Sequence, residues 1–170
     1  MTQPAWPSTQ WQIFSHDYDT QASFYAVKKA AEQIHVQMNL PTHDIAVVNN
    51  SELPLNDLRV RVRVFDTTGK LLQEKTATVT APSNATTVVT GLDLQPAIES
   101  AGVVLVKLEL KDSSGKPISD NFYWLAGRKQ DYRLMDNIAP ASLDVTAHVT
   151  PVTNGGSTSV RRQLSRLSSS

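Results

Sequence analysis

Residues 59–64 alternate without exception between arginine and valine. Because successive side chains of a β-strand point to opposite faces, this alternation predicts a strand whose Val60, Val62 and Val64 face an apolar core. The three arginines then project from the other face at spacings of roughly 7 Å. A strand of this kind needs another apolar layer over its valines, so the chain is expected to build a layered β-structure.

From residue 34 onward the hydrophobic pattern has a period of two, and turn residues arrive about every ten positions, which is typical of antiparallel sheets. Seven strands are predicted, at residues 35–39, 45–48, 59–64, 71–80, 85–90, 103–111 and 118–125. Residues 66–70 and 112–117 have the composition of turns. No helical period interrupts these strands, which favours two packed antiparallel sheets over a barrel. The predicted fold is all-β, an immunoglobulin-like β-sandwich over residues 34–126.

A helical period precedes the predicted sandwich. Four apolar residues recur at steps of three and four positions: Phe24, Val27, Ala31 and Ile34. This spacing predicts one amphipathic α-helix over about residues 20–33. A helix of this length is marginal by itself, so without docking on the sandwich it would expose its apolar stripe and fray or self-associate.

The sequence after the sandwich changes character. Residues 127–141 form a polar connection, which we interpret as a linker. Residues 143–149 alternate again, and they either pair with residues 158–164 or open a further module, because a lone strand cannot be a domain. We therefore expect residues 142–170 to hold the start of a further, incomplete β-sandwich and a mobile tail rich in serine, glycine and arginine.

Charge and hydropathy exclude two classes of partner. Sixteen lysines and arginines balance sixteen aspartates and glutamates, which is unlike a protein that grips nucleic acid or an anionic membrane. The apolar runs are about four residues long, far short of the roughly 20 needed to cross a bilayer. Neither nucleic acid nor a membrane is expected as a partner.

No pair of carboxylates is set up for acid–base chemistry. The glutamates fall on the predicted helix, in loops or at outward strand positions: Glu32, Glu52, Glu74, Glu99 and Glu109. A glycosidase needs two carboxyl groups about 5 to 10 Å apart, one of them with a raised pKa. Asp17 and Asp19 come closest, but a position just before a helix is more typical of capping and turns. We expect no catalytic residue in this chain.

Metal, thiol and cofactor chemistry find no support in the sequence either. It contains no cysteine, which excludes disulfides and thiolate nucleophiles but leaves the compartment open. Its histidines lack the spacing of three or four residues that would place two imidazoles on one metal: His16, His35, His43 and His148. No phosphate-binding loop, dinucleotide fingerprint or nucleophile elbow is present. We expect no metal and no cofactor.

Aromatic side chains form two groups. Trp6 and Trp11 precede the predicted helix, and Phe122, Tyr123 and Trp124 follow one another on the last strand. On that strand Phe122 and Trp124 share one face and Tyr123 takes the other, so at least one ring enters the core. Packing in the core or against a domain is favoured over ligand stacking, and Trp124, Tyr123 and Trp11 are the candidates for contact with a sugar or a neighbouring domain.

Two further patterns have a structural and a functional interpretation. The arginine row at residues 59–64 suits an anionic polymer, but a strand normally shows water a polar face and acidic neighbours can offset the charge. The solvated face is favoured. Asn49 and Asn84 begin glycosylation sequons, which matter only in a eukaryotic secretory host.

Several short motifs occur in a recognisable order. They are Ala5-Trp6-Pro7-Ser8, Trp11, Asp17-Tyr18-Asp19, the segments 24–30 and 34–37, then 121–125, Asp131-Tyr132 and Leu134. Together they resemble glycoside hydrolase family 2, and more closely its exo-β-D-glucosaminidase and mannosylglycoprotein endo-β-mannosidase branch. In that branch a Trp-Pro motif ends the last strand of a catalytic (β/α)8 barrel, a tyrosine-containing helix closes the barrel, and an immunoglobulin-like sandwich follows.

The resemblance covers roughly residues 5–149 and implies that residues 1–33 are the C-terminal remnant of the barrel. It implies a parent that is a retaining hydrolase of β-linked mannosides or glucosaminides, with both catalytic glutamates on earlier barrel strands. No Asn-Glu pair occurs in this sequence, so the acid/base motif of the family maps onto no position. Trp6 would line the substrate pocket in the parent. Residues 161–166 break the alternation expected of the next sandwich.

The expected function is that of a non-catalytic sandwich domain that supports the barrel and spaces the next module. Its partners would be the rest of the parent chain. One alternative is a carbohydrate-binding module that holds a polysaccharide by aromatic stacking. The other is an unrelated immunoglobulin-like interaction domain, in which the helix over residues 20–33 would have no role.

Overall fold

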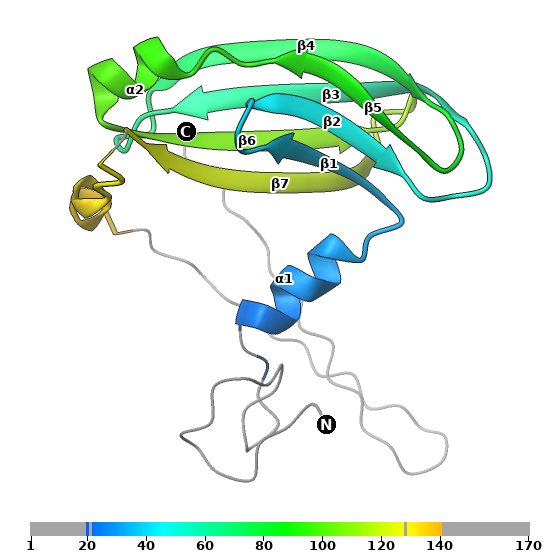
Figure 1. Cartoon of the computed structure of the whole chain (residues 1–170), viewed down its shortest axis with the longest axis horizontal. Helices are drawn as coiled ribbons and strands as arrows, with labels where there is room; N and C mark the ends of the chain where they lie inside the picture. Colours follow the sequence, from blue (N-terminus) through cyan, green and yellow to red (C-terminus); the bar gives the residue numbers. More distant parts are fainter. Residues whose placement is uncertain (1–19, 21, 128, 141–170) are drawn as a thin grey trace, which may run out of the picture. The chain divides into compact units, whose positions relative to one another are not determined.

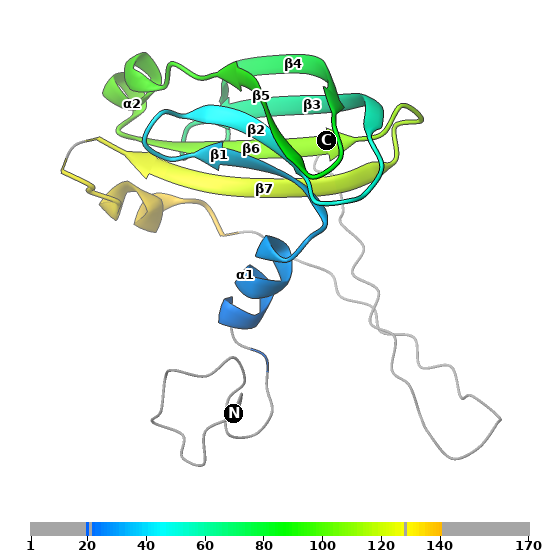
Figure 2. The same cartoon turned by 45° about the vertical axis from the view of Figure 1, so that its right-hand side comes forward.

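The computed structural model describes residues 20, 22–127 and 129–140. Within them seven strands form two antiparallel sheets, and Figures 1 and 2 show the two layers facing each other. One sheet has the order β1-β2-β5, with β1 (Ile34–Asn39), β2 (Asp44–Asn49) and β5 (Ala85–Gly91). The other has the order β4-β3-β6-β7, with β3 (Leu55–Phe65), β4 (Leu71–Ala81), β6 (Val103–Lys111) and β7 (Pro117–Ala126). The predicted immunoglobulin-like β-sandwich is confirmed.

The valines of the alternating segment lie between the two sheets. Val60, Val62 and Val64 on β3 are at most 1% exposed. Beside them β6 contributes a second buried row, Val104, Val106, Leu108 and Leu110, and the facing sheet contributes Val36, Ile45 and Val47. Full burial of one such side chain stabilises the fold by about 1.5 to 3 kcal/mol, so this apolar layer holds the two sheets together.

The two long hairpins, β3–β4 and β6–β7, close through the same kind of turn, at residues 66–70 and 112–116. In each, the leading aspartate accepts hydrogen bonds from the N–H and the hydroxyl of the residue two positions on, at 2.6 to 2.9 Å. It also accepts one from the N–H of the closing lysine, at 2.9 to 3.0 Å. Gly69 and Gly115 have φ of +86° and +88°, where a residue with a Cβ is strained. Both predicted turns are confirmed.

Asn49, at the end of β2, is a fully buried polar side chain. Its Nδ2 donates to the carbonyl oxygens of Leu53, Ala81 and Pro82 at 2.9, 3.1 and 3.0 Å. Its Oδ1 accepts from the N–H and the hydroxyl of Ser51 at 3.0 and 2.6 Å. Because Ala81 ends β4 in the other sheet, this one amide joins the two sheets at their shared end.

Two short helices lie where sequence analysis predicted none. The helix α2 (Gln95–Ala101) stands between β5 and β6, with Pro96 in its first turn and Gly102 at its end. Its single buried residue is Ile98, which belongs to the core cluster. A 3-10 helix, η1 (Arg133–Asn137), lies in the predicted linker. The sequence analysis found no helical period between the strands and so missed α2, because a helix of two turns with one buried residue shows no such period.

The predicted N-terminal helix is present but shorter than expected. It is α1 (Ala22–Ala30), and none of its residues is buried. Val27 of the predicted apolar stripe is 54% exposed, and the neighbouring Tyr25 is 58% exposed. The sandwich therefore leaves the apolar side of α1 largely uncovered. No helix among the described residues has the length and hydropathy to span a bilayer.

Replacing Asn49 with alanine removes the donor shared by three carbonyl groups, and we expect the free energy of unfolding to fall by about 2 to 3 kcal/mol. Urea denaturation followed by circular dichroism measures this change. The neighbouring Asn50 is exposed, so Asn50→Ala is the matched control and should change stability by less than about 0.5 kcal/mol. Equal losses in the two variants would contradict the role given to Asn49.

Acid should weaken the two hairpin turns. The hydrogen bond from the Thr68 hydroxyl, with backbone N–H bonds, lowers the pKa of Asp66, and Ser114 does the same for Asp112. A carboxylate with a lowered folded-state pKa stabilises the fold fully above its ordinary pKa of 3.8, and this stabilisation is lost as the pH falls through the lowered value.

The double variant Asp66→Asn/Asp112→Asn keeps an acceptor oxygen in each turn but carries no titrating group. Its urea midpoint should therefore fall less than that of the original chain between pH 4.5 and pH 2. A control that neutralises two exposed aspartates outside the turns, Asp57→Asn/Asp136→Asn, should retain the original acid sensitivity. Parallel pH profiles for the original chain and the turn variant would refute the assignment.

Candidate functional site

The two glutamates on the four-stranded sheet pair with arginines. Arg61 Nε donates to Glu74 Oε1 at 2.8 Å, and Arg63 Nη2 donates to Glu109 Oε2 at 2.7 Å. The hydrogen bond from Arg61 lowers the pKa of Glu74, whereas a glycosidase acid needs a raised one. The prediction that acidic neighbours offset the arginine row is confirmed for Arg61 and Arg63. These carboxylates serve the sheet surface as ion-pair partners.

The described histidines and acids do not gather around one point. Across residues 20, 22–127 and 129–140, no group of three or more histidine, aspartate or glutamate side chains could hold a metal ion. His35 Nδ1 lies 3.0 Å from the carbonyl oxygen of Glu32, a local contact at the start of β1. His43 lies in the turn between β1 and β2, with φ of +56°. The remaining candidates from the sequence lie outside the described residues: His16, Asp17, Asp19 and His148.

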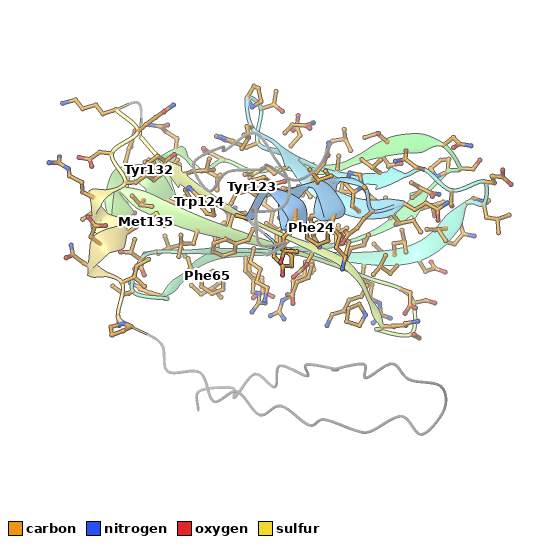
Figure 3. The ribbon with its side chains drawn as sticks, turned by 90° about the horizontal axis from the view of Figure 1, so that it is seen from below. Phe24, Phe65, Tyr123, Trp124, Tyr132 and Met135 are labelled. Carbon is orange, nitrogen blue, oxygen red and sulfur yellow. The ribbon has the colours of Figure 1, made fainter. Side chains whose placement is uncertain are left out.

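The solvent-facing side of the four-stranded sheet, called the outer face below, has an apolar end. In the strand register, Leu71, Phe65, Leu105 and Trp124 lie side by side across β4, β3, β6 and β7. We call these four residues the apolar row; Phe65 and Trp124 are labelled in Figure 3. Trp124 is 53% exposed, and Phe122 beside it on the same face is 47% exposed. Their ring centroids are 6.4 Å apart with an interplanar angle of 50°.

Tyr123 points the other way, toward the three-stranded sheet, as the strand alternation predicts. Its hydroxyl accepts from the N–H of Met38 on β1 and from Nδ2 of Asn121, each at 3.0 Å. The ring packs against the core cluster. Tyr123 therefore joins β7 to β1. Its hydroxyl already accepts two hydrogen bonds within the domain. Trp6 and Trp11, the remaining candidate contact residues, lie outside the described residues.

The opposite end of the outer face is cationic. Arg59 on β3 lies directly opposite Lys111 on β6. Neither side chain forms an ion pair with any residue that the structure describes. Both border a shallow hollow of about 440 Å³ whose far side is formed by β4, at Thr76 and Thr78. Two like charges directly opposite on neighbouring strands destabilise a sheet.

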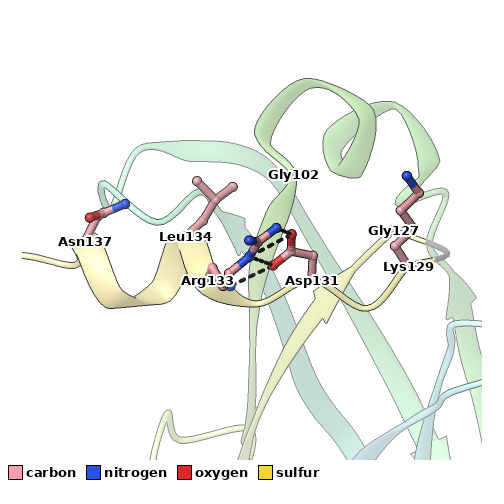
Figure 4. A pocket seen from close by; sticks show the side chains of 7 residues that line it. All are labelled: Gly102, Gly127, Lys129, Asp131, Arg133, Leu134 and Asn137. Carbon is pink, nitrogen blue, oxygen red and sulfur yellow. Dashed lines mark hydrogen bonds and ion pairs between the residues drawn. The ribbon is translucent and has the colours of Figure 1, made fainter.

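A larger hollow of about 600 Å³ lies where the linker leaves the sandwich (Figure 4). It is lined by Gly102, Gly127, Lys129, Asp131, Arg133, Leu134 and Asn137. The guanidinium of Arg133 holds the carboxylate of Asp131 and lowers its pKa to about 2. Leu134 fills the space over Gly102, where a Cβ would lie 2.7 Å from Leu134 Cδ1. Asp131 and Arg133 neutralise each other within the linker, and Leu134 is the side chain that contacts the sandwich, at Gly102.

A polar clamp joins α1 to the sandwich; it consists of Lys29, Glu32, Ser119 and Asp120. Lys29 Nζ donates to Asp120 Oδ1 at 2.6 Å and to Glu32 Oε1 at 3.1 Å. The Ser119 hydroxyl donates to Glu32 Oε2 at 2.7 Å. Burial opposes the charged form of Lys29, but the bonds to Asp120 and Glu32 outweigh it and raise the pKa of this amine. No sequence pattern signals a contact between residues 91 positions apart.

The two glycosylation sequons differ in their accessibility in the structure. Asn49 is buried and its Nδ2 is already engaged by three carbonyl groups, so the folded domain offers no acceptor there. Asn84 is exposed between β4 and β5, with φ of +50°. Only the second sequon is accessible in the folded chain.

Comparison with known proteins identifies relatives over most of the chain. Residues 42–130 match the model of a family described as the Mannosidase Ig/CBM-like domain. An exo-β-D-glucosaminidase from Streptomyces avermitilis is 29% identical over 177 residues, covering 93% of this chain and 20% of that protein. A mannosylglycoprotein endo-β-mannosidase from Lilium longiflorum is 32% identical over 171 residues, covering 98% of this chain and 18% of that protein. The chain spans about a fifth of these relatives' length.

Two solved structures share the fold. The exo-chitosanase of Amycolatopsis orientalis superposes with a TM-score of 0.74 and 23% identity, over 90% of this chain and 20% of that one. The β-D-mannosidase of Dictyoglomus thermophilum superposes with a TM-score of 0.58 and 18% identity, over 73% of this chain and 15% of that one. The resemblance drawn from the sequence motifs is confirmed by these matches.

Removing the charge at the centre of the polar clamp should loosen α1. Lys29→Met breaks both ion pairs of the amine, and a nine-residue helix without buried side chains has little else to hold it. The helix population over Ala22–Ala30, measured from Cα chemical shifts, should fall by at least about a third. Lys28→Met, which changes the exposed neighbouring lysine, is the control. A similar fall in both variants would show that the clamp does not order the helix.

Proposed function

Because the chain belongs to the Mannosidase Ig/CBM-like domain family, we propose that it is a non-catalytic β-sandwich domain of a family 2 glycoside hydrolase. In this proposal the parent enzyme acts on β-mannosides or β-glucosaminides with retention of configuration. The sandwich supports the catalytic barrel and spaces the next module. The partners of the domain are then the barrel and the adjacent sandwich of the same polypeptide.

The observation that carries this proposal is the extent of the family match. Residues 42–130 correspond to an immunoglobulin-like domain, and the whole chain corresponds to about a fifth of relatives named as exo-β-D-glucosaminidase and endo-β-mannosidase. The pairing of Glu74 and Glu109 with arginines is additional support, because both carboxylates are engaged in surface ion pairs. The match also removes the alternative of an unrelated interaction domain.

The exposed side of α1 supports the proposed domain layout. We assign residues 1–33 to the end of the barrel, 34–126 to the sandwich, 127–141 to the linker and 142–170 to a further module. Val27 would then pack on barrel segments upstream of the chain, which explains why the sandwich leaves it exposed. Trp6 would line the substrate pocket of the parent, an assignment that rests on the family resemblance.

Carbohydrate binding is the second candidate function, and the exposure of Trp124 and Phe122 favours it. The relative orientation of the two rings argues against carbohydrate binding. With 50° between the rings, the pair does not form one flat platform for consecutive sugar units. Tyr123 is committed to the β1–β7 contact. Contact between Trp124 and an adjacent module fits these features better than stacking on a polysaccharide.

The purified chain should release no product from 4-nitrophenyl β-mannoside or 4-nitrophenyl β-glucosaminide. The exo-chitosanase of Amycolatopsis orientalis, assayed in parallel, establishes that the glucosaminide assay detects turnover. Release of 4-nitrophenol that persists through purification and is lost in Glu74→Gln or Glu109→Gln would overturn the proposal. Glutamine keeps the size of glutamate and an acceptor oxygen for the paired arginine, so both variants should retain the fold.

A further inference from the structure

The outer face carries an excess of positive charge that the chain as a whole does not have. The full sequence balances sixteen basic against sixteen acidic residues. The outer face presents five cations: Arg59, Arg61, Arg63, Lys107 and Lys111. Its acids are Glu74, Glu109 and Asp120, and Asp120 is engaged by Lys29 of α1. Two carboxylates thus remain for five cations.

The excess is concentrated at one point. Glu74 and Glu109 neutralise Arg61 and Arg63, and Lys107 Nζ lies 3.9 Å from Glu109. Arg59 and Lys111 stay as directly opposed like charges beside the hollow of about 440 Å³. Such a pair costs stability in the isolated domain. A carboxylate bound in the hollow would offset the repulsion between Arg59 and Lys111.

The other end of the outer face carries exposed apolar side chains. The apolar row crosses all four strands, and Trp124 and Leu71 at its two ends are about half exposed. Between them Phe65 and Leu105 are partly exposed, and the Arg63 guanidinium lies 5.6 Å from the centroid of the Phe65 ring. Exposed apolar side chains with a polar surround mark contact sites for other molecules. One face therefore combines an apolar row with a separate hollow that is lined by three cations and one acid, Glu109, which is paired with Arg63. Of those cations, Arg59 and Lys111 form no ion pair with any residue that the structure describes.

The size of this face limits what can cover it. Four strands about 4.8 Å apart and 9 to 11 residues long, rising about 3.4 Å per residue, give a projected area of roughly 600 to 700 Å² for the whole face. A freely diffusing partner in a stable complex typically needs about 800 Å² on each side. Contacts between domains of one chain form with about 300 to 750 Å² on each side, since the linker keeps them together. The area fits an occupant in the same polypeptide.

We propose that the outer face docks a neighbouring module of the same polypeptide, through a surface that places carboxylates opposite Arg59 and Lys111 and apolar side chains opposite the apolar row. The inference rests on the proposed function, in which further modules flank this chain; the relatives are about five times as long. An amino-sugar polymer would bring ammonium groups to a cationic surface. A second copy of the chain would oppose two cationic faces.

The test titrates the isotope-labelled 170-residue chain with an acetylated peptide of alternating glutamate and leucine, six residues long, at low ionic strength. We expect amide shifts at Arg59, Lys111 and Trp124, and weaker binding of hexaglutamate, which lacks the apolar side chains. Arg59→Glu/Lys111→Glu should weaken binding of the alternating peptide at least tenfold. Trp124→Ser should weaken it at least threefold while leaving hexaglutamate binding unchanged.

Lys28→Glu/Lys129→Glu makes the same charge change at exposed lysines away from the outer face, and it should alter binding less than twofold. Amide spectra of all variants establish that they fold. An equal loss in this control, or no shift up to 10 mM peptide, would overturn the inference. So would stronger shifts at the same residues with a glucosamine hexamer, or self-association through Trp124. Glycosidic turnover is measured separately, so failure of the proposed function is distinguishable from failure of this docking face.

Discussion

The strict alternation along β3 is the constraint on which the other features depend. Because side chains alternate with a period of two, a shift of β3 by one residue would bury three arginines and expose three valines. The cost of burying unpaired charge excludes that arrangement, so the register of β3 with β4 and β6 is set by the core. The same register places Glu74 beside Arg63, Glu109 beside Arg61, and Leu105 beside Phe65. The alternation along β3 thus determines both which side chains form the core and which side chains are neighbours on the outer face.

What the sequence could predict follows from the same physics. Strands and turns were predictable because alternation and the Asp-x-Ser/Thr-Gly-Lys pattern are local, as residues 66–70 and 112–116 illustrate. That Trp124 and Tyr123 take opposite faces was also predictable, since it follows from strand geometry, but which of them faces outward was not. The helix α2 was missed, because its place depends on Ile98 reaching a core built by distant strands. The polar clamp and the hydrogen bonds of Asn49 depend on partners that only the tertiary fold brings close.

The domain joins its neighbours by different physical means at its different surfaces. Ion pairs and hydrogen bonds hold α1 through Lys29 and Glu32, and they are directional, so they fix an orientation without burying much surface. The linker is held by the fit of Leu134 over Gly102, which depends on shape. A domain whose proposed task is support gains from contacts that set angles, because in that proposal the catalytic site lies on another module and needs a rigid frame.

The bond from Met38 to Tyr123 has a consequence for behaviour at high concentration. β1 is an edge strand, and the unpaired N–H and C=O groups of an edge strand are a template for adding strands from other molecules. The phenol of Tyr123 occupies one of these N–H groups from within the same chain, and Asn121 Nδ2 approaches the Val36 carbonyl at 3.4 Å. A strand added at Met38 and Val36 would first have to displace these two side chains, so the native fold hinders strand addition at this part of the β1 edge.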